Sequence, residues 1–141
     1  MEELLINVKL DGHAVLPKKA HDADAGFDLF AIEGLVIPGK GCGIFDTGVH
    51  FEIPKGYVGF LKSKSGLNIK HGVRGEGVID SGYTGSVVVK LYNDSPFNYQ
   101  VEAGDKICQI VFLPIPNVVL NIVDEIGATE RGDNGFGSTG R

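Results

Sequence analysis

The chain has little of several residue types that mark well-known classes of protein. It has no tryptophan, one methionine and two cysteines, Cys42 and Cys108, which are too far apart for metal-ligand spacing. Its four histidines form no HExxH or histidine-rich pattern, so a metal held by protein ligands alone is not expected. Free, buried thiols in a cytoplasmic protein are the simplest interpretation of the two cysteines.

Long apolar runs and an excess of positive charge are also missing. No stretch is long and apolar enough to span a bilayer, and the acidic, alternating start of the chain does not fit a signal peptide. The formal net charge is −5, whereas a protein that binds the nucleic-acid backbone needs a basic surface. We therefore expect neither a membrane segment nor stable nucleic-acid binding.

Glycine is abundant, at 21 of 141 residues, about twice its usual share. Short β-branched runs alternate with turn signals, and no long segment has helical periodicity, which favours one all-β sandwich or barrel domain. One short helix is expected after Gly66, and the Pro114–Pro116 step is expected to end or bend a strand. The predicted strands include residues 5–10, 35–37, 50–53, 57–61, 86–92, 98–102, 107–113 and 118–123.

The glycine-rich C-terminal tail, residues 130–141, is set apart from the domain at residues 1–129. Such a segment cannot form a core and loses much entropy on ordering. It offers a cation, a flat ring and two hydroxyls, the groups that would close over a phosphorylated, ring-bearing ligand. A loose chain end is an equal alternative.

Two acidic segments could carry chemistry. Residues 22–31 place three carboxylates among small residues, which could bind a metal or act as acid and base, or could be a polar loop that enters a strand. In residues 77–85, Asp80 could orient and deprotonate a water molecule, and Tyr83 could pack against a sugar. The alternative is that Asp80 caps a turn and Tyr83 belongs to the core.

A third segment, residues 62–67, alternates lysine and serine and then places Gly66 before the possible helix. Backbone N–H groups at such a turn, with Ser65 and a lysine, suit a phosphate. The spacing of a P-loop is absent, and a solvated strand end is an equal alternative.

Taken in order, these segments resemble the trimeric dUTP diphosphatase (dUTPase) family in five blocks. The blocks are AGFDLFA (25–31), KSKSG (62–66), GVIDSGYTG (77–85), GDKICQIVFLP (104–114) and RGDNGFGSTG (131–140). The resemblance implies a jelly-roll, or β-clip, barrel that forms a homotrimer with active sites at the subunit interfaces. It also implies Mg²⁺-dependent hydrolysis of dUTP to dUMP and pyrophosphate, which limits uracil incorporation into DNA and supplies dUMP for dTMP synthesis.

The resemblance also assigns roles to residues. Asp80 would orient the water that attacks the α-phosphorus, Tyr83 would pack under the deoxyribose, and Asp28 would support the water shell of Mg²⁺. Phe136 would stack on uracil. The remaining substrate-binding residues implied are Lys64, Ser65, Gly66, Gly77, Ile79, Gln109, Arg131, Gly137, Ser138 and Thr139.

The sequence departs from the family pattern at a few places. Lys64 and Lys106 stand where the family usually has arginine, so the planar two-point fork is lost while the charge is kept. Residues 72–76 are short for the hairpin that reads uracil, which affects the residue-level base contacts.

Two other functions fit the same fold. The related dCTP deaminases carry a catalytic glutamate where this chain has Lys90, and a lysine cannot replace a carboxylate as a proton shuttle. A non-catalytic scaffold that senses nucleotides or binds a protein is the second alternative, against which the intact Asp80, Tyr83 and tail argue.

Overall fold

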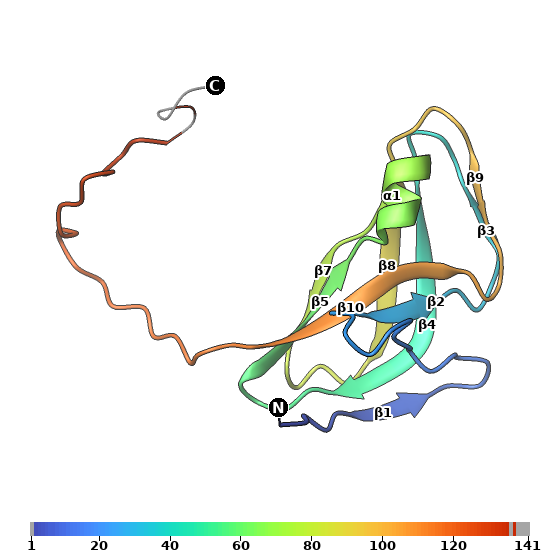
Figure 1. The fold of residues 1–141 in the computed structure, drawn as a ribbon, viewed down its shortest axis with the longest axis horizontal. Coiled ribbons are helices and arrows are strands. Elements are labelled where there is room, and N and C mark those ends of the chain that lie inside the picture. The colour runs from blue at the N-terminus through green and yellow to red at the C-terminus, as the bar shows by residue number, and fades with distance from the viewer. Residues whose placement is uncertain (1, 136, 138–141) are drawn as a thin grey trace.

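The computed structural model describes residues 2–135 and 137, and within them strands and one short helix follow one another as shown in Figure 1. The elements are β1 (Asn7–Leu10), β2 (Phe27–Phe30), β3 (Leu35–Ile37), β4 (Cys42–Glu52), β5 (Tyr57–Lys62), α1 (Ser65–His71), β6 (Val73–Arg74), β7 (Gly77–Ile79), β8 (Ser86–Asn93), β9 (Tyr99–Val101) and β10 (Lys106–Pro114).

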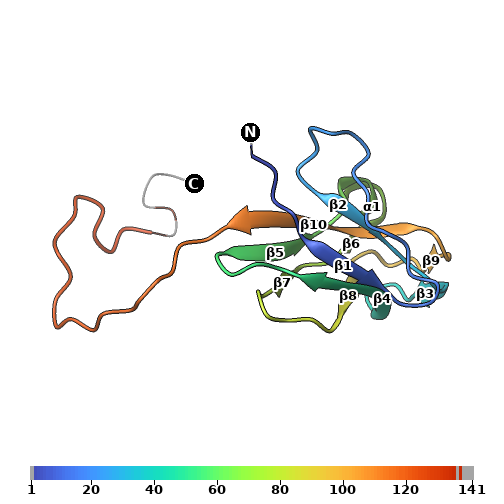
Figure 2. The ribbon, with the colours of Figure 1, turned by 90° about the horizontal axis from the view of Figure 1, so that it is seen from below.

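Two four-stranded antiparallel sheets form the body of the molecule (Figure 2). One sheet has the strand order β1-β4-β8-β6, the other has the order β2-β10-β5-β7, and β3 pairs with β9 separately. The expected jelly-roll type of all-β fold with one short helix is thus confirmed. Its core is apolar and includes the buried side chains Leu29, Ile37, Val49, Val73, Val87, Leu91, Val101, Ile107 and Ile110.

Strand β8 shows how the sequence pattern builds this core. Val87, Val89 and Leu91 are buried, while the residues between them, Val88 and Lys90, are exposed. Successive side chains of a strand point to opposite faces, so the alternation leaves one face of β8 against the core and the other open.

Strand β4 departs from this alternation in its middle. Residues 47–49 are all buried, and the pairing with β8 shifts between Asp46 and His50. Two extra residues of β4 are accommodated there as an irregular bulge, and the buried Thr47 hydroxyl donates to the Val87 carbonyl at 2.7 Å. Such bulges re-aim the side chains that follow them.

The prediction of a strand at residues 118–123 is wrong for the chain as described. Strand β10 ends at Pro114, as the Pro-Ile-Pro step predicted, and residues 115–135 then run away from the body (Figures 1 and 2). Val119, Leu120 and Ile122 are between 82% and 97% exposed. A strand needs a neighbouring strand to pair with, and this segment lies away from both sheets.

The boundaries of several strands differ from those expected from the sequence. Strand β4 begins eight residues earlier than the predicted run at residue 50, and β6 and β7 were not predicted as strands.

Cys108 is buried, as expected, but Cys42 is exposed because it lies on the outward face of β4. Burial raises the pKa of the Cys108 thiol to about 12. Within residues 2–135 and 137, no helix has the length and apolar character to cross a membrane.

Candidate active site

A buried carboxylate links three of the segments that the sequence singled out. Asp28 lies on β2 and is 3% exposed. One of its carboxylate oxygens is 2.6 Å from Nζ of Lys64, and the other is 3.5 Å from Nζ of Lys106. Because a buried charge is costly unless it is paired, these two lysines, which stand in place of arginines, are held at the start of α1 and of β10.

Gln109 lies at the centre of the same sheet. It is the register partner of both Asp28 and Lys62, and its side-chain amide donates to the Ser63 carbonyl at 3.0 Å. Gly26 permits this arrangement, since a Cβ at that position would collide with the Gln109 amide. The structure therefore brings the first, second and fourth sequence blocks together.

The short helix α1 presents Ser65 and Gly66 at its start. Both residues are exposed, and the capping position, Lys64, makes no side-chain capping hydrogen bond. The helix ends at Gly72, which adopts a left-handed φ of 69° and donates its N–H to the Asn68 carbonyl. A left-handed residue is favourable for glycine alone, so the end of α1 is determined locally.

A polar cluster that the sequence did not predict links the end of β5 to residues 75 and 76, which lie between β6 and β7. The Ser63 hydroxyl accepts from the Gly75 N–H at 3.0 Å and donates to a Glu76 carboxylate oxygen at 3.1 Å. Lys62 donates to the other oxygen of Glu76 at 3.1 Å. Burial alone would raise the pKa of Glu76, but the hydrogen bonds from Lys62 and Ser63 outweigh it and lower the pKa.

Asp80 and Tyr83 lie on the loop between β7 and β8. Asp80 is exposed, and its carbonyl accepts from the Tyr83 N–H at 3.2 Å, which closes a turn. The Tyr83 hydroxyl donates to the Ser86 carbonyl at 2.8 Å, while the side chain remains 46% exposed. The alternative that Tyr83 is a core residue is therefore wrong. The hydroxyl end of the side chain is held by Ser86, and the exposed part of the ring is accessible to a ligand.

The residues predicted to bind phosphate, which include Gln109 and are called the phosphate-type residues below, lie toward one end of β5. The predicted catalytic residue Asp80 lies toward the other end. Gln109 is opposite Lys62, whereas Ile79, which precedes Asp80, is opposite Gly59. At about 3.3 Å per residue, this register separates the phosphate-type residues from Asp80 by roughly 10 Å or more along the sheet. Among the described residues, the register therefore places Gln109 and Asp80 at separate positions along the sheet.

The structure describes only part of the tail, residues 130–135 and 137. Arg131 is exposed, and its Nε donates to the Asn134 carbonyl at 2.8 Å. Gly137 has a left-handed φ of 89°. Phe136, Ser138 and Thr139 lie outside the residues that the structure describes.

Metal binding by side chains alone has no ready site in the described part of the chain. No group of three or more His, Cys, Asp or Glu residues there could hold a metal ion. The Asp28 carboxylate, expected to act on a metal through water, instead faces the ammonium groups of Lys64 and Lys106. Lys90, at the position that would be a glutamate in a deaminase, is exposed on β8 with its Nζ 5.1 Å from the Tyr92 ring centroid.

Comparison with family models and curated proteins gives matches over most of the chain. The family model described as dUTPase matches residues 12–140. A deoxyuridine 5'-triphosphate nucleotidohydrolase of Clostridium tetani is 42% identical over the full length of both chains.

Solved structures are similar over nearly the whole chain as well. The dUTPase of Staphylococcus bacteriophage 80alpha with dUPNHPP has a TM-score of 0.91 and 32% identity, and the match covers 97% of this chain and 99% of that one. A mutant dUTPase of phage phi11 of S. aureus, which coordinates a structural Mg(II) ion, has a TM-score of 0.81 and 29% identity over 86% of this chain and 98% of that one. A family match over most of the sequence, a relative at this identity and the shared fold lead to one conclusion: the chain belongs to the dUTPase family.

Proposed function

We propose that this chain is a dUTP diphosphatase that hydrolyses dUTP to dUMP and pyrophosphate. The observation that carries the proposal is the β7–β8 loop, where an exposed carboxylate, Asp80, stands three residues before an exposed, hydroxyl-anchored ring, Tyr83. In a member of the dUTPase family, this pair supplies a group that handles water and a flat surface for a sugar.

In the proposed reaction, Asp80 orients a water molecule and accepts its proton. The water oxygen forms a bond to the α-phosphorus, the bond from that phosphorus to the bridging oxygen breaks, and pyrophosphate leaves in line with the attack. Such reactions depend mainly on positioning and charge neutralisation. The exposed turn between Asp80 and Tyr83 leaves room for both the water and the sugar ring.

The substrate is the Mg²⁺ complex of dUTP, because Mg²⁺ prefers phosphate oxygens and water to a cage of protein ligands. The Asp28 carboxylate lies between Lys64 and Lys106 and offsets one of their two positive charges. We therefore assign Asp28 to the orientation of Lys64 toward the phosphates, and its support of the metal's water shell stays a prediction.

The phosphates are bound by groups near the start of α1 and on β10. Lys64 provides a positive charge, Ser65 and Gly66 provide an exposed hydroxyl and N–H, and Gln109 provides an amide. Gly77 and Ile79 lie on β7 next to the Asp80 loop and line the side where the base is bound.

We propose that a complete site forms between subunits of a homotrimer. Gln109 and Asp80 lie at different positions along β5 within one chain, and in the proposed trimer a neighbouring subunit supplies further groups to the same site. The exposed face of β8, with Val88 and Tyr92, offers one apolar surface for such contacts.

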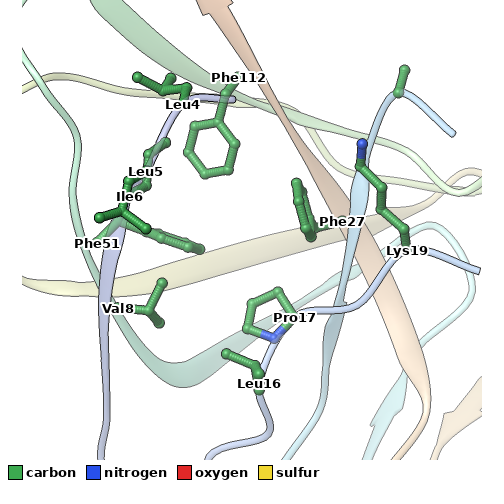
Figure 3. Close-up of a pocket in the computed structure, with 11 residues that line it drawn as sticks. Leu4, Leu5, Ile6, Val8, Leu16, Pro17, Lys19, Phe27, Phe51 and Phe112 are labelled. Carbon is green, nitrogen blue, oxygen red and sulfur yellow. The ribbon is translucent and has the colours of Figure 1, made fainter. Parts of the chain in front are cut away.

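The apolar arm at residues 118–126 offers another contact between subunits. It exposes five large aliphatic side chains that are 68–97% open, Val118, Val119, Leu120, Ile122 and Ile126. An open apolar pocket of about 580 Å³ lies beside β1, with Phe27, Phe51 and Phe112 around it (Figure 3). Exposed apolar surface of this extent favours burial against another copy of the chain.

The tail is proposed to complete the site as a lid, with residues 1–129 as the enzyme body and 130–141 as the moving segment. Arg131, Gly137, Ser138 and Thr139 would contact the phosphates, and Phe136 would stack on uracil. The glycines allow the segment to order only when substrate is bound. In a cell, the same reaction limits uracil incorporation into DNA and supplies dUMP for dTMP synthesis.

One assay separates this function from its alternatives. The purified chain is incubated with each deoxynucleoside triphosphate and Mg²⁺, and both pyrophosphate and ammonia are measured. Pyrophosphate from dUTP alone is expected. Ammonia from dCTP would instead identify a deaminase, and nucleotide binding without any turnover would identify a non-catalytic scaffold.

A further inference from the structure

His50, on β4, joins three separate segments of the chain. Its Nδ1 lies 2.7 Å from the Thr84 carbonyl oxygen, and its Nε2 lies 2.8 Å from Oδ2 of Asp11. Asp11 belongs to the turn after β1, and Thr84 belongs to the loop that carries Asp80 and Tyr83. The His50 side chain is 21% exposed, so the ring is largely enclosed by these contacts.

Both partners of the His50 ring are hydrogen-bond acceptors. A carbonyl oxygen and a carboxylate oxygen can bond a ring nitrogen only if that nitrogen carries a hydrogen. Neutral imidazole has one N–H, whereas imidazolium has two, so only the cation satisfies both contacts. The hydrogen bond to Asp11, followed by the one to Thr84, raises the pKa of His50 above its ordinary value.

The other charges around His50 come from β1 and β4. Lys9 is its register partner on β1 and opposes protonation, while Glu52 is two residues along β4 and bonds Asn7. Asp46, across the bulge, has its pKa lowered mainly by the Ser86 hydroxyl and partly by the His50 charge. Asp11 remains the carboxylate in direct contact with the ring.

The Thr84 carbonyl fixes the far end of the catalytic loop. The near end is held by pairing of Ile79 with Gly59. Between these ends, Tyr83 adjoins Thr84 and bonds Ser86 through its hydroxyl. If the bond to Thr84 is lost, the loop is still held at Ser86, which pairs with His50 at the start of β8, but Thr84 itself loses its contact with β4.

We propose that His50 is a positioning residue for dUTP hydrolysis, which as an imidazolium bridges Asp11 to the Thr84 carbonyl and so sets the placement of Tyr83 and Asp80. The inference rests on the proposed function. Because the pKa of His50 is raised, the bridge is complete below the ordinary pKa of histidine and is lost as the pH rises through the raised value.

Three substitutions test this role through the pH profile of kcat/KM for dUTP. His50→Leu removes both donors and is expected to lower kcat/KM about tenfold at neutral pH, the value of one hydrogen bond to a charged group. His50→Asn keeps a donor at the position of Nδ1, so it is expected to restore most of the rate and to lose the alkaline fall. Asp11→Asn is expected to move that fall to lower pH.

Exposed His13 provides the control, and His13→Leu is expected to leave the profile unchanged. A pH profile that is identical in wild type, His50→Asn and Asp11→Asn would overturn the proposal. So would equal losses in the Leu and Asn variants, since a purely structural role does not depend on the donor at Nδ1.

A spectroscopic measurement tests the bridge independently of turnover. In ¹⁵N-labelled wild-type protein, both ring nitrogens of His50 are expected to be protonated at pH values below the raised pKa of the ring. The Thr84 and Gly85 amide shifts should follow the same titration. A His50 that loses its proton below the ordinary pKa of histidine would overturn the bridge, whereas a raised titration without dUTP turnover would show that only the proposed function has failed.

Discussion

Nζ of Lys64 lies 2.6 Å from a carboxylate oxygen of Asp28, whose side chain is only 5% exposed. This ion pair ties the start of α1 to β2. Lys64→Met would leave the buried carboxylate with Lys106 alone, at 3.5 Å. We expect the free energy of unfolding to fall by about 2–3 kcal/mol, because the partner of a buried charge is removed.

The measurement is denaturant unfolding at one fixed protein concentration, since assembly contributes to stability. Lys62→Met is the matched control. The Lys62–Glu76 pair has side chains 56% and 53% exposed, and such pairs contribute about 1 kcal/mol or less. Equal losses in the two variants would contradict the assigned difference in burial.

Asp80→Asn tests the proposed water-handling role. The amide keeps the size of the side chain but cannot accept a proton, so kcat is expected to fall by at least about 100-fold, with dUTP affinity nearly unchanged. Pyrophosphate release and calorimetric binding measure the two quantities. Asp22 is also exposed, and the control variant Asp22→Asn should behave as wild type. If Asp80→Asn loses both dUTP binding and turnover, Asp80 is a structural residue.

Removal of residues 131–141 tests the lid. We expect kcat/KM for dUTP to fall severely, because Arg131 and the residues after it no longer enclose the phosphates and base. The midpoint of thermal unfolding and the number of subunits per particle are expected to stay the same, since the described residues of this segment, 131–135 and 137, lie outside the buried core. A truncated protein that keeps full activity would leave the tail as a loose chain end.

The arm provides a test of assembly. Ile122 is 97% exposed in the single chain, so Ile122→Asp should have no effect on a monomer. If the arm packs against another subunit, the buried charge is expected to shift the protein to a smaller species in size-exclusion chromatography with light scattering. Ile69→Asp, at a position 84% exposed on α1, is the matched control and should keep the wild-type mass.

Gly26→Ala tests the contact between the first and fourth sequence blocks. The added methyl group would displace the Gln109 amide from its place beside Ser63. We expect KM for dUTP to rise by about tenfold, the scale of one hydrogen bond to a charged group. Gly12→Ala, which meets no atom within 4 Å, should leave KM unchanged, and an equal effect of both would remove Gln109 from the phosphate site.

Much of the fold could be predicted from local patterns. The alternation of Val87, Val89 and Leu91 with exposed residues marks β8 directly, and Pro114 marks the end of β10. The strand at residues 118–123 was predicted wrongly for the same reason. Its β-branched and aliphatic residues favour a strand, but a strand forms only where a partner edge is available.

The sequence by itself determined the family, the all-β class and the set of chemically capable residues, because these depend on residue order and local periodicity. Only the tertiary structure decided which residues meet. Asp28 pairs with Lys64 and Lys106, and His50 bridges Asp11 to Thr84. Gln109 and Asp80 are held apart along β5. Each of these relationships involves segments far apart in the chain. Such contacts are set by sheet register and by a bulge in β4, which no local pattern specifies.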